Sequence, residues 1–169
     1  NSLRAVNIAY ANEMAIVMQN LKLDAKEIIS GVQTKPFGLG LCYPGPGVGG
    51  HCIPVDPFYL IGESRKRGFD PSFLRVAMRV NNYMPGYVVS LLLHAMNDAG
   101  KSVNGSSIGI LGVSYKKNVG DVRESPSLEI IKRVKKLGAD VVIYDPYVEE
   151  YATTSLDNVF SCDAVMLLT

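Results

Sequence analysis

The sequence has few cysteines, little net charge and no long hydrophobic run. Its 169 residues include three cysteines, Cys42, Cys52 and Cys162, with no Cys-x-x-Cys pair. This odd, sparse set argues against a disulfide framework and favours a reducing cytoplasm. The net charge of +1 argues against nucleic acid as the main partner. No apolar run reaches the ~18 residues that span a bilayer and no signal peptide is visible, so we expect no membrane partner.

Two familiar site signatures are also missing. His51 and Cys52 are adjacent, but two further ligands at zinc-finger spacing are absent, so we expect no metal site. The segment Gly109-Ile110-Leu111-Gly112 is not a Gly-x-Gly-x-x-Gly run, so the usual dinucleotide fingerprint is absent there. Apolar residues nevertheless make up 47% of the chain, which is enough for a sizeable core.

The first third of the chain shows helical periodicity. Apolar residues recur every three or four positions in residues 1–21, which predicts a helix with one apolar face. These positions are Leu3, Val6, Tyr10, Met14, Val17, Met18 and Leu21. From the pattern alone we interpret Asn1, Asn7 and Asn12, on the polar side, as solvated or capping residues. Asp24 and Glu27 form a capping box that predicts a short helix, 25–30, ended by Gly31.

Two longer helices are expected downstream. Asp56 as N-cap and Pro57 as first helical residue predict a helix that reaches about Lys66. From residue 72 to 99 the apolar pattern is helical throughout, about 40 Å in length, and we expect Pro85 to kink or split it. So long a helix cannot bury all its apolar side chains in a small domain. We therefore predict a homodimer interface there; packing on domains outside this chain is the alternative.

Strands follow a polar linker at residues 101–106. Buried strands are predicted at 107–113, 141–145 and 162–168. A helix capped by Ser125 and Pro126 separates the first two strands. The side chains that should face the core from this helix are Leu128, Ile131, Val134 and Leu137. Alternating strands and helices predict a parallel sheet.

These patterns together predict an α + α/β fold with two domains. An all-helical domain covers residues 1–102, and an incomplete Rossmann-like domain with a parallel sheet covers residues 103–169. The chain opens within helical periodicity and stops within an apolar run, so we expect a fragment of a longer polypeptide.

The most informative stretch runs from Tyr43 to Phe58. Four glycines and two prolines occur between Pro44 and Gly50, which excludes a helix or a central strand. Such a loop lets main-chain N–H groups approach a ligand closely, as in phosphate-binding nests. Cys52 follows, just before a predicted helix N-terminus, and this setting favours the nucleophilic thiolate. A lone cysteine is more often a small buried residue, but the glycine-rich loop beside it favours a nucleophile.

A second candidate segment, residues 115–124, follows the first predicted strand. Ligands bind beyond the carboxyl ends of parallel strands, and Lys and Arg suit phosphate. The alternative is a solvated loop in which Asp121 and Arg123 pair with each other. The residues of this segment alone favour that alternative.

Three motifs resemble the nucleotide-sugar 6-dehydrogenase family, which includes the UDP-glucose, GDP-mannose and UDP-N-acetylhexosamine dehydrogenases. The run Gly49-Gly50-His51-Cys52-Ile53-Pro54-Val55-Asp56-Pro57 resembles its nucleophile motif. Residues 1–13 resemble the start of its central dimerisation domain, and residues 112–126 the start of its C-terminal nucleotide-binding domain. The family's N-terminal Rossmann domain, its catalytic Lys four residues before Asn1 and the end of its C-terminal domain are missing. We therefore expect no turnover by this chain alone.

The resemblance implies an NAD-dependent, four-electron oxidation of a UDP-sugar C6 alcohol to a uronate. Cys52 attacks the intermediate aldehyde, and the resulting thiohemiacetal is oxidised to a thioester that water hydrolyses. Asn1 matches the residue that holds this water and the developing oxyanion. Asp56 matches the residue that orders or activates the water.

The resemblance also implies binding residues. Tyr115 and Lys116 match substrate contacts, and Arg123 matches a residue near NAD. The main-chain cradle for the sugar nucleotide corresponds to Tyr43, Pro44, Gly45, Pro46, Gly47, Val48 and Gly49.

The residue at position 55 bears on the substrate. The UDP-glucose and GDP-mannose branches usually have Lys where this chain has Val55, and Val55 together with His51 resembles the UDP-N-acetylhexosamine branch. We favour UDP-N-acetylmannosamine, with UDP-N-acetylglucosamine close behind. A UDP-glucose 6-dehydrogenase and a non-catalytic dimerisation and nucleotide-binding module are the alternatives.

Overall fold

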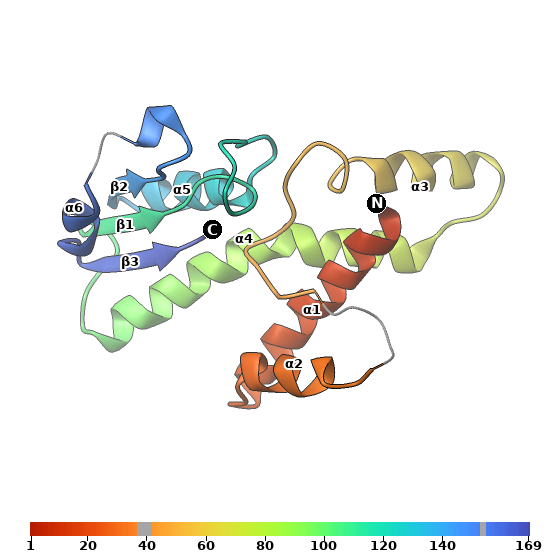
Figure 1. The fold of residues 1–169 in the computed structure, drawn as a ribbon, viewed down its shortest axis with the longest axis horizontal. Coiled ribbons are helices and arrows are strands. Elements are labelled where there is room, and N and C mark those ends of the chain that lie inside the picture. Colours follow the sequence, from red (N-terminus) through yellow and green to blue (C-terminus); the bar gives the residue numbers. More distant parts are fainter. Residues whose placement is uncertain (37–41, 153–154) are drawn as a thin grey trace. The chain divides into compact units, whose positions relative to one another are not determined.

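The computed structural model describes residues 1–36, 42–152 and 155–169, and its chain forms two compact units (Figure 1). The first unit comprises Asn1–Val48 and Cys52–Met84, and the second comprises Gly49–His51 and Pro85–Thr169. The predicted class is confirmed, because helices fill the first half of the chain and a parallel sheet with helices follows.

The first unit is helical. It contains α1 (Ser2–Asn20), α2 (Ala25–Gln33), α3 (Asp56–Lys66) and the first half of α4 (Ser72–Asp98). The predicted Asp24 cap is confirmed, since the Asp24 side chain accepts hydrogen bonds from the main-chain N–H groups of Lys26 and Glu27. Helix α2 continues through Gly31, where we expected it to end, because Gly31 does not adopt the left-handed conformation that would close the helix.

The prediction of the buried face of α1 is wrong. Leu3, Tyr10 and Leu21 are each more than half exposed. The buried positions are instead small or polar, with Ala5 and Asn12 among them. Small side chains let another helix approach the α1 backbone closely, whereas the pattern of large apolar residues used for the prediction carries no information about that contact.

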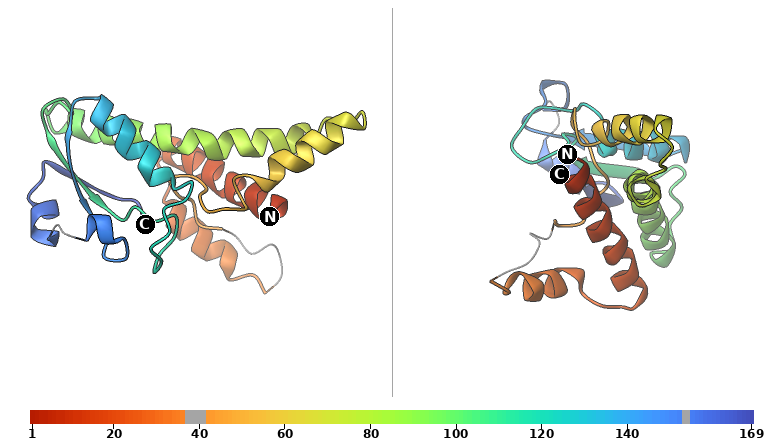
Figure 2. Two further views of the ribbon diagram at one scale, coloured as in Figure 1. Left: turned by 90° about the horizontal axis from the view of Figure 1, so that it is seen from above. Right: turned by 90° about the vertical axis from the view of Figure 1, so that its right-hand side faces the viewer.

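Helix α4 is a single helix, so Pro85 does not split it (Figures 1 and 2). Pro85 lacks one main-chain donor, which removes one hydrogen bond of the helical ladder without ending the helix. The division between the two compact units falls at the same place, between Met84 and Pro85.

The second unit contains a three-stranded parallel sheet. Its strands are β1 (Ser107–Leu111), β2 (Asp140–Tyr144) and β3 (Ala164–Leu167), in the order β2-β1-β3. Strand β1 is central and pairs in register with both neighbours. The parallel arrangement confirms the prediction, and the carboxyl ends of all three strands meet at one edge.

Helices cover the sheet of the second unit. Helix α5 (Pro126–Lys136) and the last turns of α4 contribute to one core with β1, in which Ile108 and Ile110 are fully buried. On the other face, Gly109 lets α6 (Leu156–Phe160) approach β1, because a Cβ at Gly109 would lie 2.6 Å from the carbonyl oxygen of Val159. A short 3₁₀ helix, Glu149–Tyr151, lies between β2 and α6.

The prediction for the inward face of α5 is right in part. Ile131 and Val134 are buried and Leu128 packs against the core. Leu137 is 38% exposed, and the fully buried Ile130 was not predicted. Leu137 follows the last residue of the helix, so the helical spacing used to place it no longer applies there.

None of the helices in residues 1–36, 42–152 and 155–169 combines the length and the apolar character needed to cross a membrane.

The amino ends of β1 and β3 are held by Asp163. Its carboxylate accepts hydrogen bonds from Lys101 Nζ at 2.6 Å and from the main-chain N–H and hydroxyl of Ser107, each at 3.0 Å. The hydrogen bond from Lys101, followed by those from Ser107, lowers the pKa of Asp163 to about 2. In the unfolded chain the same carboxyl has an ordinary pKa of ~3.9.

This difference in pKa predicts how stability depends on acid. A carboxyl whose pKa is lower in the folded state stabilises the fold fully above about pH 4, and this contribution is lost as pH falls toward 2. We expect the urea midpoint of the wild-type protein to fall over that range, and to fall less steeply for Asp163→Asn, which has no proton to gain. Urea titrations at several pH values measure this, and parallel curves for the two proteins would contradict it.

Candidate functional site

The structure brings Asn1 and Asp56 together in the first unit, although 55 residues separate them. Asn1 lies at the start of α1 and donates a hydrogen bond from its side-chain Nδ2 to Asp56 Oδ2 at 2.5 Å. The prediction that Asp56 caps α3 is wrong. Val55 occupies the N-cap position, Asp56 is the first helical residue, and the Asp56 carboxylate bonds to Asn1.

Cys52 lies one turn before α3. Its main-chain carbonyl accepts hydrogen bonds from the N–H groups of Val55 at 3.1 Å and Asp56 at 2.8 Å. Cys52 is exposed, whereas Cys42 and Cys162 are half-buried. A cysteine that serves only as a small apolar residue is normally buried, so the exposure of Cys52 favours a chemical role.

The glycine-rich loop is tied to α1 and α4 by a buried pair of asparagines in the first unit. The N–H of Gly45 donates to Asn12 Oδ1 at 2.9 Å, and Asn12 Nδ2 donates to Asn81 Oδ1 at 3.1 Å. Asn81 Nδ2 in turn donates to the carbonyl of Ala5 at 2.9 Å. Asn12 is fully buried, so our interpretation of it as a solvated or capping residue is wrong.

The described part of the loop forms neither helix nor strand, as predicted. Its first residue, Tyr43, is exposed and donates from its hydroxyl to Gln33 Oε1 at 3.1 Å. The five residues that follow, 44–48, are half-buried in the first unit. Gly47 has a φ of 141°, a conformation that residues with a side chain rarely adopt.

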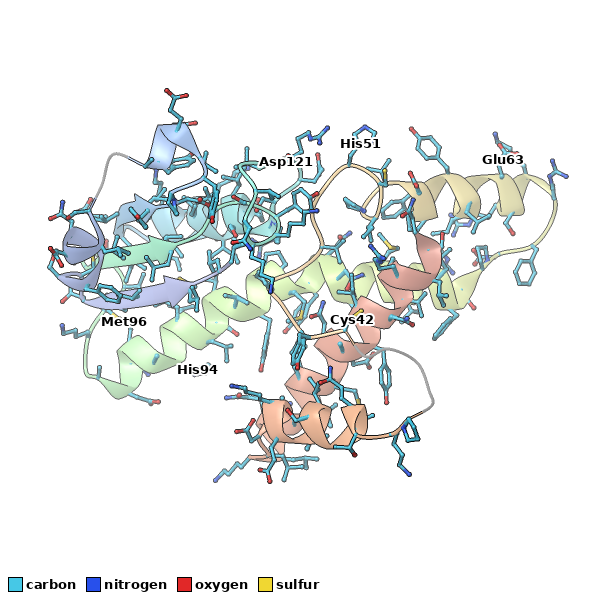
Figure 3. All side chains as sticks on the ribbon, viewed as in Figure 1. Cys42, His51, Glu63, His94, Met96 and Asp121 are labelled. Carbon is cyan, nitrogen blue, oxygen red and sulfur yellow. The ribbon has the colours of Figure 1, made fainter. Side chains whose placement is uncertain are left out.

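The end of the loop lies against the segment 115–124 within the second unit. Gly50 N–H donates to the carbonyl of Arg123 at 2.9 Å. A Cβ at Gly49 would lie 2.6 Å from Tyr115 Cβ and 2.8 Å from the carbonyl oxygen of Glu124. The backbone therefore passes directly over Tyr115, which brings together two segments singled out separately in the sequence. His51, the next residue, extends outward from the loop (Figure 3).

Arg123 and Asp121 pair with each other, as the alternative interpretation of this loop predicted. Arg123 Nη2 lies 2.6 Å from Asp121 Oδ2, and Arg123 Nε lies 3.0 Å from Oδ1. Hydrogen bonds from the Arg123 side chain and then from its main-chain N–H lower the pKa of Asp121 to about 2. The Asp121 side chain lies in the loop after β1 (Figure 3).

A cavity of about 210 Å³ lies at the carboxyl edge of the sheet in the second unit. Lys116, Lys117 and Asn118 line it from the β1 loop, and Tyr144, Asp145 and Tyr147 line it from the end of β2. Lys116 Nζ lies 5.4 Å from the centre of the Tyr115 ring, within the range of a cation–π contact. This is the edge where parallel sheets bind ligands, and its lysines suit an anionic group.

Asp145 and Asn81 were not singled out from the sequence. Both are buried polar side chains that hold loops of the candidate site. The signal for Asp145 was its place as the last residue of a predicted buried strand, where a charged side chain is unusual. Nothing in the pattern around Asn81 distinguishes it from other polar positions in a long helix.

Within the described ranges, no group of three or more His, Cys, Asp or Glu side chains is arranged to hold a metal ion.

Two family models match the sequence. Residues 1–83 match the UDP-glucose/GDP-mannose dehydrogenase family, central domain, and residues 109–169 match the UDP binding domain of the same family. The chain belongs to the UDP-glucose/GDP-mannose dehydrogenase family. This confirms the family expected from the three motifs, and it identifies the helical first half as family central-domain sequence.

Individual relatives agree with this membership. UDP-N-acetyl-D-mannosamine dehydrogenase of Methanococcus maripaludis is 36% identical over 100% of this chain and 39% of its own length. UDP-N-acetyl-D-glucosamine 6-dehydrogenase of Salmonella typhi is 37% identical over 88% of this chain and 35% of its own length. The chain thus spans less than two-fifths of these curated relatives.

Solved structures share the fold. The UDP-D-ManNAc dehydrogenase of Pyrococcus horikoshii superimposes with a TM-score of 0.91 at 34% identity, covering 99% of this chain and 39% of that one. A UDP-glucose dehydrogenase from Pyrobaculum islandicum gives a TM-score of 0.88 at 28% identity, covering 99% of this chain and 41% of that one.

Proposed function

We propose that this chain is the central and C-terminal part of an NAD-dependent UDP-N-acetylhexosamine 6-dehydrogenase, acting on UDP-N-acetylmannosamine. The observation that carries the proposal is the exposed Cys52, one helical turn before Asp56, whose carboxylate is fixed by Asn1. A nucleophile, an acid–base group and an amide donor are the groups that oxidation of an alcohol to an acid through a thioester requires.

In this proposal NAD⁺ accepts a hydride in each of two oxidations. Loss of hydride and a proton from the C6 alcohol gives an aldehyde. The Cys52 thiolate adds to the aldehyde carbon, and the thiohemiacetal then loses a second hydride to give a thioester on Cys52 Sγ. Water attacks the thioester carbon, the C–S bond breaks, and the products are the uronate and the regenerated thiolate. The balance is one water consumed, two hydrides transferred to NAD⁺ and three protons released.

Asn1 and Asp56 act on the water in this scheme. The Asp56 carboxylate accepts the proton of the attacking water, and the hydrogen bond from Asn1 keeps the carboxylate oriented. The Asn1 amide can also donate to the oxyanion that forms as water adds. Because the thiol must be reduced to react, the proposal includes a reducing, cytoplasmic location.

We assign contacts with the UDP-sugar within each unit separately. In the first unit we assign to the sugar nucleotide the main-chain N–H groups of Tyr43, Gly47 and Val48, because Pro44 and Pro46 have no N–H and that of Gly45 bonds to Asn12. In the second unit we assign to it Gly49 and Lys116, which supplies positive charge beside Tyr115. The match of residues 109–169 to a UDP binding domain supports this assignment. Arg123, which we associated with NAD, bonds to Asp121, so that carboxylate partly neutralises its charge.

The sugar is the finer part of the proposal. The names of the relatives from Methanococcus maripaludis and Pyrococcus horikoshii favour UDP-N-acetylmannosamine, and Val55 agrees with the N-acetylhexosamine branch. The similarity to a solved UDP-glucose dehydrogenase keeps UDP-glucose as the second candidate.

Turnover of the full-length protein on a panel of sugars tests the proposal. We expect NADH and uronate from UDP-N-acetylmannosamine, with two NADH formed per uronate, and slower reaction with UDP-N-acetylglucosamine, UDP-glucose and GDP-mannose. A faster reaction with UDP-glucose would show that UDP-glucose, and not UDP-N-acetylmannosamine, is the substrate. No reaction with any of the four would favour the non-catalytic module.

We also propose that the full-length protein is a homodimer through the central helices. Phe73, Val76 and Tyr83 on α4 are exposed apolar side chains of the first unit, and an interface would cover them. Light scattering is expected to give twice the monomer mass. A monomer at high protein concentration would contradict the proposal.

A further inference from the structure

Asp145 is a buried carboxylate at the carboxyl end of β2, with only 3% of its surface exposed. Its Oδ2 accepts hydrogen bonds from the N–H of Val113 at 2.8 Å and from the N–H and hydroxyl of Ser114 at 3.1 and 2.9 Å. Its Oδ1 accepts from the N–H of Tyr147 at 2.9 Å. One side chain thus joins the loops that follow two neighbouring strands, β1 and β2.

The carboxylate is held in its charged form by these donors. Burial raises the pKa of Asp145, but the hydrogen bonds from Val113, Tyr147 and Ser114 outweigh burial and leave the pKa below its ordinary value. The Asp145 carboxylate accepts four hydrogen bonds, and a buried donor that loses its acceptor lowers the stability of the fold. The two loops that Asp145 joins are therefore held in fixed positions.

The constrained residues adjoin the proposed UDP contacts. Val113 and Ser114 directly precede Tyr115 and Lys116, and the carbonyl of Ser114 also accepts from Thr169 Oγ1 at 2.6 Å. Tyr115 N–H donates to the carbonyl of Asp121, which fixes the far side of the same turn. The Tyr115 side chain lies beneath Gly49 and Gly50 of the glycine-rich loop, within the same unit.

Asp145 does not suit direct contact with the ligand. It is buried, both its oxygens bond to the protein, and its negative charge would repel a phosphate. Any effect of Asp145 on a UDP ligand therefore acts through the residues that it holds.

We propose that Asp145 is a positioning residue for nucleotide binding: by holding Val113 and Ser114, it places Tyr115 and Lys116 for contact with UDP. The inference rests on the proposed function only in that Tyr115 and Lys116 contact the substrate. It assigns to the residue after β2 a part in binding that the sequence motifs place only on the glycine-rich loop and the β1 loop.

The variant Asp145→Asn tests this in the full-length protein. Asparagine has the same size as aspartate, but one of its two side-chain acceptors is replaced by an NH₂ group. That NH₂ group must face either the N–H of Tyr147 or the donors of Val113 and Ser114, so at least one hydrogen bond is lost because two donors face each other. The matched control is Asp163→Asn, because Asp163 bonds the N–H and hydroxyl of Ser107 in the same manner at the opposite end of β1. UDP alone is the probe, and its affinity is measured by titration calorimetry.

We expect Asp145→Asn to weaken UDP binding roughly tenfold, as the loss of one to two buried hydrogen bonds in a binding loop implies. Asp163→Asn is expected to bind UDP within about twofold of the wild type, although both variants lose thermal stability. Hydrogen exchange at residues 113–118 should accelerate in Asp145→Asn only. If Asp145→Asn folds poorly, Ser114→Ala removes only the hydroxyl bond to Asp145 and should weaken UDP binding about threefold.

The outcomes separate this inference from the proposed function. Wild-type affinity for UDP in Asp145→Asn or, where that variant does not fold, in Ser114→Ala overturns the positioning role, as does equal weakening in Asp163→Asn. If the wild type binds UDP but oxidises no sugar nucleotide, the proposed function fails while the affinities of the variants still decide the role of Asp145. A wild type that does not bind UDP overturns both.

Discussion

Replacing Cys52 with alanine in the full-length protein is expected to slow uronate formation by about 10³-fold or more and to remove the second of the two NADH formed per sugar. In the proposed mechanism the thiohemiacetal between the two oxidations forms on the sulfur of this residue, and so does the thioester that follows the second oxidation. Without the sulfur, an aldehyde has no covalent path to the acid, and neither Asn1 nor Asp56 can replace the nucleophile. Uronate detected by mass spectrometry, together with NADH absorbance, measures the effect.

The control for this experiment is Cys162→Ala. Cys162 follows α6 in the second unit, and its thiol contacts the carbonyl of Asn158 at 3.4 Å. Removing it deletes a thiol without touching the proposed site, so turnover should remain within about twofold of the wild type. If Cys52→Ala still produces uronate at the wild-type rate, Cys52 is not the nucleophile.

Local patterns predicted the elements of the fold well. Periodicity placed the three strands of the parallel sheet and the long α4, and side-chain chemistry placed the caps at Asp24 and Ser125. The buried face of α1 was missed because helix packing there depends on small side chains. Ala5 and Ala9 give no hydrophobic signal that stands out from the larger residues around them, yet both are buried, and Asn81 bonds to the α1 backbone at Ala5.

Motif resemblance predicted the members of the candidate site but not how they are held. The resemblance assigns Asn1 and Asp56 to the same hydrolytic water, and the hydrogen bond between them agrees with that assignment. The supports of the loops are long-range contacts: Asn12 bonds to Asn81 across 69 positions, and Ser114 bonds to Asp145 across 31. Contacts between residues so far apart in the sequence produce no local pattern, so these hydrogen bonds can be seen only in the folded chain.

Replacing Gly49 with alanine is expected to lower the free energy of unfolding by about 2–4 kcal/mol, because the added methyl group overlaps rigid atoms. The new Cβ would lie 2.6 Å from Tyr115 Cβ, 2.8 Å from the Glu124 carbonyl oxygen and 3.1 Å from Pro126 Cδ. Two of these neighbours belong to backbone or to a ring, so they cannot rotate away. The segment 49–51 must then separate from Tyr115, and the Gly50 to Arg123 hydrogen bond is lost with it.

Gly45→Ala provides the matched control, since Gly45 belongs to the same loop and a Cβ there would meet nothing within 4 Å. Neither glycine adopts a positive φ, so the two substitutions differ in steric contact and not in backbone conformation. Because alanine restricts the unfolded chain more than glycine does, Gly45→Ala should leave stability unchanged or raise it by up to about 1 kcal/mol. Urea unfolding of both variants measures the difference. Equal stabilities would mean that the backbone at Gly49 does not pass over Tyr115 as closely as 2.6 Å implies, and the contact between residues 49–51 and the β1 loop would then have to be abandoned.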